Sequence, residues 1–141
     1  MQPGCVQRPR APLAIAAAGP RGQEIAARHG EAWVSCGPLD VSRPWTQDEF
    51  RAAVRDQLAG LAAAGRRVGR DVSTMDRIVV TTDLTGELLK SADDFARHAE
   101  RYAALGVSEL IIHWPRAEGV YAGDPAVLAD IAASVLPRLR D

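Results

Sequence analysis

The sequence predicts an α/β protein in which about four parallel strands alternate with helices. Short apolar runs recur along the chain, and each is followed by a segment whose apolar residues have helical spacing. Glycine or proline stands at most junctions, where it ends one element and permits the turn into the next. Strands that alternate with helices pair in parallel through right-handed crossovers. The expected architecture is therefore a parallel sheet with helices packed against it.

The first strand–helix unit is the most informative part of the chain. The apolar run 13–18 suits a strand buried on both faces, as in parallel sheets, and Gly19 is expected to permit the turn that follows. Pro20 takes the first helical position, where a residue without an N–H loses no hydrogen bond. The helix is expected over 20–29, with Ile25 and Ala26 on its inward face.

The second unit contains the longest predicted helix. A short strand is expected at 32–35, and a polar loop follows it. Thr46 then begins the helix, because Glu49 three residues later completes a capping box. Apolar residues at helical spacing continue to about Ala64, and Gly65 and Gly69 are expected to break the helix.

The third and fourth units repeat the order of the elements but not the sequence. The β-branched run 78–82 predicts a strand, and the run 109–114 predicts another. Ser91 caps the helix between them. Asp124 and the proline after it are typical of a helix start, so the last helix begins there.

Composition indicates one globular domain and excludes several classes of function. The chain has 141 residues, of which 47% are apolar and 25% charged. Residues 1–11 contain prolines and little pattern, so we expect a tail or linker there and the domain over 12–141. A net charge of −1 gives no basic excess for a nucleic-acid surface. No apolar run reaches the ~20 residues of a membrane span, so no membrane contact is expected.

The cysteine and histidine content points to a reducing cytoplasm and to no metal site. Cys5 and Cys36 cannot form a disulfide framework. Arg8 and Arg10 before the run 13–18 faintly resemble a signal peptide, but that run continues into a strand, a turn and a helix. The three histidines have no ligand spacing with either cysteine.

The sequence Gly19-Pro20-Arg21 is a candidate anion site at the carboxyl end of the first strand. Catalytic and ligand-binding residues in such folds lie at the carboxyl ends of the strands. The free N–H groups at the helix start and the helix dipole favour an anion, and Arg21 would add positive charge. The alternative is an ordinary turn with a surface arginine.

The other strand ends carry further candidates. His113 would serve as an acid–base group or hydrogen-bond donor, or would simply pack beside Trp114. Thr82 and Asp83 would bind ligand hydroxyls, or would cap the following turn. Tryptophans offer stacking surfaces for an aromatic cofactor, although they are more often core or rim residues: Trp33, Trp45 and Trp114.

Three segments together carry a resemblance to a known family: PLAIAAAGPRGQEIAARHGEAW, AAAGRRVGRDVSTMDRIVVTTD and DDFARHAERYAALGVSELIIHWPR. They resemble the luciferase-like monooxygenase superfamily, which includes oxidoreductases that use the deazaflavin coenzyme F-420. They occur in the family's order, and the resemblance runs from about Pro12 to the carboxyl terminus. Glu31 departs from the pattern, since the family usually has aspartate there.

The resemblance implies a partial (β/α)₈ TIM barrel, because the chain has about half of the roughly 250 residues of a complete barrel. This chain would be the carboxyl-terminal half. The resemblance implies that FMN or coenzyme F-420 binds at the carboxyl end of the strands, with its phosphate-bearing side chain at Gly19, Pro20 and Arg21. Thr82 and Trp114 would also contact the cofactor, and His113 is the candidate catalytic residue.

The implied activity is hydride transfer or monooxygenation of a small organic substrate, carried out by the cofactor. Two alternatives are a non-catalytic half-barrel fragment and a small α/β module that binds a phosphorylated ligand. Half a barrel leaves two open strand edges, at 13–18 and 109–114, and exposes the apolar inner face of the sheet. We therefore expect association, either as a homodimer or with a partner chain that completes the barrel.

Overall fold

The computed structural model describes residues 6–8, 10–40, 42–81 and 85–139. Four strands form one parallel sheet in the order β1-β2-β3-β4. They are β1 (Ala14–Ala16), β2 (Ala32–Ser35), β3 (Asp76–Val80) and β4 (Glu109–Ile111). The predicted α/β class with four parallel strands is confirmed.

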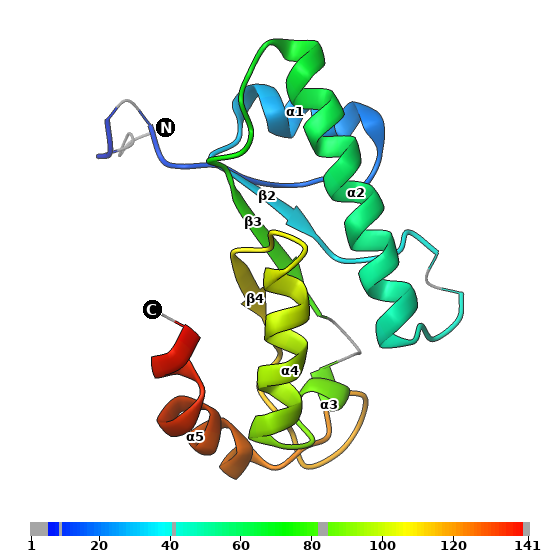
Figure 1. Ribbon diagram of the computed structural model, residues 1–141, viewed down its shortest axis with the longest axis vertical. Coiled ribbons are helices and arrows are strands. Elements are labelled where there is room, and N and C mark those ends of the chain that lie inside the picture. Colours follow the sequence, from blue (N-terminus) through cyan, green and yellow to red (C-terminus); the bar gives the residue numbers. More distant parts are fainter. Residues whose placement is uncertain (1–5, 9, 41, 82–84, 140–141) are drawn as a thin grey trace.

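Helices connect the strands and pack as two pairs, α1 with α2 and α4 with α5 (Figure 1). The α-helices are α1 (Pro20–His29), α2 (Gln47–Val68), α3 (Thr85–Leu88), α4 (Ala92–Ala103) and α5 (Pro125–Ser134). A 3₁₀-helix, η2 (Leu136–Leu139), follows α5. The short α3 and η2 were not predicted, because neither carries a full helical repeat of apolar residues.

Local signals placed the helix starts correctly. The Thr46 side chain accepts from the Glu49 N–H, and the Glu49 carboxylate accepts from the Thr46 N–H, so the predicted capping box is present. Ser91 accepts from the Asp94 N–H, and Asp124 accepts from the Ala126 N–H. These contacts satisfy N–H groups that the first helical turn leaves without acceptors.

The edge strands are shorter than predicted. β1 keeps three residues of the run 13–18, and β4 ends at Ile111 rather than at 114. A strand at a sheet edge has hydrogen-bonding partners on one side only, so apolar composition alone does not extend it. His113 therefore lies beyond the strand, in the loop that leads to α5.

α2 continues through Gly65, contrary to the sequence prediction, and ends at Gly69, the second glycine that was expected to break it, whose φ is +70°. A Cβ at position 65 would lie 2.8 Å from the Arg70 carbonyl oxygen and 3.0 Å from the Val72 side chain. The Arg70 N–H donates to the Gly65 carbonyl oxygen (3.0 Å). Gly65 thus lets the returning chain lie directly against the helix.

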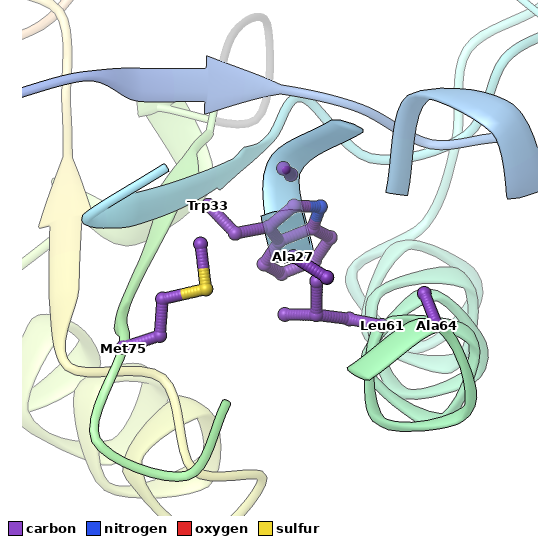
Figure 2. Close-up of a cluster of buried hydrophobic side chains, with 6 residues drawn as sticks. Ala27, Trp33, Leu61, Ala64 and Met75 are labelled. Atoms are coloured by element: carbon purple, nitrogen blue, oxygen red, sulfur yellow. The ribbon is translucent and has the colours of Figure 1, made fainter. Parts of the chain in front are cut away.

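The core lies between the helices and one face of the sheet. Alternate strand residues point to this face, among them Ile15, Trp33, Val79 and Leu110. Figure 2 shows the Trp33 ring among side chains from α1, α2 and the residue before β3, namely Ala27, Leu61, Ala64 and Met75.

The inward face of α1 agrees with the prediction at Ala26 and differs from it at Ile25. Gln23, Ala26 and Ala27 are buried, whereas Ile25 is 55% exposed. The small alanines allow α1 to lie close to α2, and the Gln23 amide donates to the Gln57 carbonyl oxygen of α2 (2.9 Å). Ile25 lies away from this contact because it precedes Ala26 by about 100° around the helix.

The other face of the sheet is apolar except for Asp76 and Glu109 at the amino ends of β3 and β4, and no helix of the described residues covers it. Its apolar residues include Ala16, Val34, Ile78, Val80 and Ile111. Ala16 is exposed, and Ile111 is 46% exposed at the β4 edge. Helices on one side and an open apolar face on the other are the geometry of part of a closed barrel.

Candidate functional site

The Gly19-Pro20-Arg21 turn forms the start of α1 at the carboxyl edge of the sheet. Gly19 is the N-cap and makes no side-chain cap, and Pro20 follows at the start of the helix. The Gln23 N–H donates the first intrahelical bond, to the Gly19 carbonyl oxygen (3.0 Å), so the Arg21 and Gly22 amides precede the hydrogen-bond ladder. The first turn of α1 contains no acidic residue, and Arg21 is exposed.

Gly19 is not required by the backbone conformation, which corrects the sequence interpretation. Its φ of −97° and ψ of 163° are available to any residue. A Cβ at this position would meet nothing within 4 Å. What glycine provides here is an uncovered approach to the first amides of α1.

Two residues that sequence reasoning did not connect with the turn hold it in place. The Trp33 indole N–H of β2 donates to the Ala17 carbonyl oxygen (2.6 Å), and the Ala17 N–H donates to the Val34 carbonyl oxygen (3.1 Å). A Cβ at Gly22 would lie 3.0 Å from the Ala17 Cβ, so glycine permits the close contact between helix and strand. The spacing of Gly19 and Gly22, three positions apart, is a sequence signal that could have indicated this close contact.

Ser35, at the end of β2, belongs to a structural network. It is buried, its hydroxyl donates to Gln57 Oε1 (2.6 Å), and its Oγ accepts from the Gly37 N–H (3.0 Å). The Gln57 amide in turn donates to the Gly37 carbonyl oxygen (2.8 Å). These bonds fix the loop after β2 against α2, and Cys36 between them is exposed.

The end of β3 is only partly described. Thr81 is buried, and both its N–H (3.0 Å) and its hydroxyl (3.3 Å) donate to the Ile111 carbonyl oxygen. Thr82 and Asp83 lie outside the described residues. The predicted contact of Thr82 with a cofactor therefore stays a prediction.

His113, after β4, stacks on Tyr121. The two ring centroids are 4.1 Å apart, with 26° between the ring planes. The loop 115–123 returns Tyr121 to this place, since the Arg116 N–H donates to the Tyr121 carbonyl oxygen (2.8 Å). Tyr121 was missed because nothing in the sequence signals a contact across an irregular loop. Trp114 is 70% exposed.

The other two tryptophans are structural. Trp33 is fully buried in the core. The Trp45 indole N–H donates to the Asp40 carbonyl oxygen (2.6 Å), and the Arg43 guanidinium lies 3.7 Å from the Trp45 ring centroid. Of the three rings, Trp114 is the most exposed.

The candidate residues lie at opposite edges of the sheet. Arg21 follows β1 and His113 follows β4, and these edge strands are three strand spacings apart, about 14 Å. A compact ligand would reach one group of residues, whereas an extended cofactor would span both. Among the described residues, no three His, Cys, Asp or Glu side chains gather as a metal site would require.

The comparisons with known proteins show the fold and leave the family open. No family profile matches the sequence, and no curated protein matches it. A solved structure of an F-420-dependent secondary alcohol dehydrogenase, in complex with an F-420–acetone adduct, has a TM-score of 0.64 at 14% identity. The match covers 95% of this chain and 50% of that chain.

No helix in the described part of the chain is long and apolar enough to cross a membrane.

The four-stranded sheet, with helices on one face, matches a TIM-barrel-like unit that spans half the length of its structural neighbour.

Proposed function

We propose that this chain is the carboxyl-terminal half-barrel of an oxidoreductase that uses the deazaflavin coenzyme F-420. The observation that supports this most is the fold likeness over 95% of the chain to an F-420-dependent secondary alcohol dehydrogenase. We favour F-420 over FMN, and hydride transfer over monooxygenation, because that neighbour is described as an F-420-dependent dehydrogenase. The family indicated by the three sequence segments agrees with the proposal.

The residues at the start of α1 fit the phosphate of such a cofactor. A phosphate there would accept from the Arg21 and Gly22 amides, which lie outside the intrahelical ladder. The open space beside Gly19 lets an oxygen approach these amides. Arg21 would add a charged donor, and no acidic side chain in the first turn competes for it.

The residues after β4 are suited to the end of the cofactor at which the reaction would take place. When bound, F-420 supplies the hydride chemistry. Trp114 would offer an exposed ring face to the cofactor or the substrate. Tyr121 holds the His113 imidazole by stacking, so that a ring nitrogen would donate to an oxygen of a small organic substrate.

The uncovered face of the sheet is where the rest of the barrel would lie. A first half-barrel, carried by a second copy or by a partner chain, would pair with the β1 and β4 edges and cover Val34, Ile78 and Ile111. We also propose a reducing cytoplasm as the setting, in keeping with the exposed thiol of Cys36.

A cofactor titration tests the proposal. The purified chain is titrated with F-420 and, separately, with FMN, while cofactor fluorescence is followed. We expect saturable binding of F-420 that Arg21→Ala weakens about tenfold, the effect of losing one charge-assisted hydrogen bond. Arg28→Ala is the matched control, because Arg28 is exposed in the last turn of the same helix.

Each alternative predicts a different result. Preferential binding of FMN would overturn the choice of cofactor. Equal binding by Arg21→Ala and the wild type would remove the phosphate role of the Gly-Pro-Arg turn. If a folded sample bound neither cofactor, the chain alone would be a non-catalytic half-barrel, and the proposed pocket would need the other half.

A further inference from the structure

A pocket of about 420 Å³ opens at the amino edge of the sheet, at the end opposite the proposed cofactor site. Its walls come from the end of α2, the chain between α2 and β3, the start of β3, and Leu105 after α4. The volume is within the range of small-molecule sites. Leu58 and Leu61 provide apolar wall, so the polar residues decide which ligand fits.

Three arginines line this pocket: Arg66, Arg70 and Arg77. None of them forms an ion pair with a carboxylate of the described residues. Arg70 donates to the Ala27 carbonyl oxygen (3.0 Å), and Arg77 donates from Nη2 to the Ser73 carbonyl oxygen (3.1 Å). Most of their N–H groups therefore have no acceptor within the described part of the chain.

Of the three arginines, Arg77 has a buried hydrogen-bond donor that lacks an acceptor among the described residues. It is the second residue of β3 and pairs in register with Trp33, so its side chain starts on the helix-covered face of the sheet. Its Nε is buried and makes no hydrogen bond with the described residues. A buried charged donor without an acceptor is costly, and an anion would relieve that cost.

Asp71, the one carboxylate among the residues that line the pocket, is already hydrogen-bonded to Ser73. Asp71 accepts from the Ser73 N–H (2.8 Å) and from the Ser73 hydroxyl (2.9 Å). These bonds lower the pKa of Asp71, so it is ionised at neutral pH. Three guanidinium groups and one carboxylate leave a net charge of +2 around the pocket.

We propose that this pocket binds a phosphate group, carried by a small phosphorylated molecule, between the guanidinium groups of Arg66 and Arg77. Guanidinium groups present paired N–H donors that match phosphate oxygens, and a dianion balances the net charge of the pocket. The apolar wall around Leu58 and Leu105 receives the remainder of the ligand. This site is separate from the α1 start, since it lies at the other edge of the sheet.

The experiment uses inorganic phosphate as the probe and the arginine Nε–H resonances of the full chain as the readout. Phosphate is added at constant ionic strength against sodium chloride. We expect a saturable shift of the Arg77 resonance at millimolar phosphate. Arg66→Gln is expected to weaken this binding about tenfold, since it removes one charge-assisted contact.

Two control variants make the result specific. Arg67→Gln changes the neighbouring arginine, which pairs with Glu24 outside the pocket (2.7 Å), and should bind phosphate as the wild type does. Arg21→Ala should also leave the Arg77 shift unchanged, which separates this pocket from the proposed cofactor site. No saturable shift of Arg77, or an equal affinity in Arg66→Gln, would overturn the proposal.

Discussion

At the scale of single residues, His98 lies in surroundings that disfavour its charged form. It is buried on α4, and its Nδ1 lies 3.2 Å from Arg51 Nη1 of α2. Arginine only donates, so Nδ1 accepts in the neutral imidazole. Burial lowers the pKa of His98 first, and Arg51, Arg101 and Arg97 lower it further, whereas Glu87 of α3 acts in the opposite direction.

Because of these surroundings of His98, we expect the free energy of unfolding to fall in mild acid. The folded-state pKa of His98 lies below its ordinary value of 6.5, so the unfolded chain binds more protons as the pH falls below about 6.5. Stability is then complete above that pH and decreases toward the lowered pKa, with a slope of at most about 1.4 kcal/mol per pH unit. Urea unfolding between pH 7 and pH 5 measures this slope.

The matched variant is His98→Gln, which keeps a polar side chain but does not titrate. Its stability should change less than that of the wild type across this pH range. Equal slopes in both proteins would show that other groups carry the pH dependence. Carboxylates with lowered pKa values, such as Glu31 and Glu49 (lowered from 4.5, that of Glu49 to about 2), also lose stability toward pH 5, but they do so equally in both proteins. The difference between the two slopes therefore belongs to His98.

At the scale of elements, α2 shows how tertiary contacts override a local signal. Glycine in a helix interior normally costs about 1 kcal/mol relative to alanine. Gly65 nevertheless lies within the helix, since a Cβ there would meet the Arg70 carbonyl oxygen and the Val72 side chain. The close contact of the returning chain compensates for the helix propensity that glycine loses.

Substitution of Gly65 by alanine should therefore destabilise the protein. We expect a net loss of about 1–2 kcal/mol in the free energy of unfolding, because overpacking of about 1–3 kcal/mol exceeds the gain in helix propensity. Urea unfolding measures it. Ala63→Gly, the opposite change two residues earlier, should also destabilise, by about 1 kcal/mol. A stabilised Gly65→Ala would contradict the packing argument.

At the scale of the whole molecule, the main feature is a sheet with one face that no described helix covers. Helices cover one face, while Val34, Ile78, Val80 and Ile111 leave the other apolar. Among the described residues, β1 and β4 each pair with a strand on one side only, and such edges are templates for further strands. Both features favour association with another half-barrel.

A substitution at the exposed edge tests this association. If two copies pair in solution, Ile111→Lys should raise the dimer dissociation constant at least about tenfold, since burial of one isoleucine contributes about 1.5–3 kcal/mol. Sedimentation velocity measures the change. Ile25→Lys is the control, because Ile25 is 55% exposed on α1, away from the sheet face. A stable wild-type monomer with both edge strands protected from hydrogen exchange would contradict the open-edge argument.

The sequence by itself determined the local structure. The bounds Pro20–His29 and Ala32–Ser35 were predicted as they are observed, and Thr46, Ser91 and Asp124 cap the helices as expected. Caps and periodicity depend on residues a few positions apart, so they can be read along the chain. Element order then implied the parallel sheet.

Only the tertiary structure decided which distant residues meet. The Trp33 bond to Ala17, the stacking of His113 on Tyr121, and the arginine pocket at the amino edge join separate elements. Gly65 within α2 and the exposed Ile25 depend on how neighbouring segments pack. Such contacts result from the path of the folded chain, whereas a local pattern contains only the propensities of neighbouring residues.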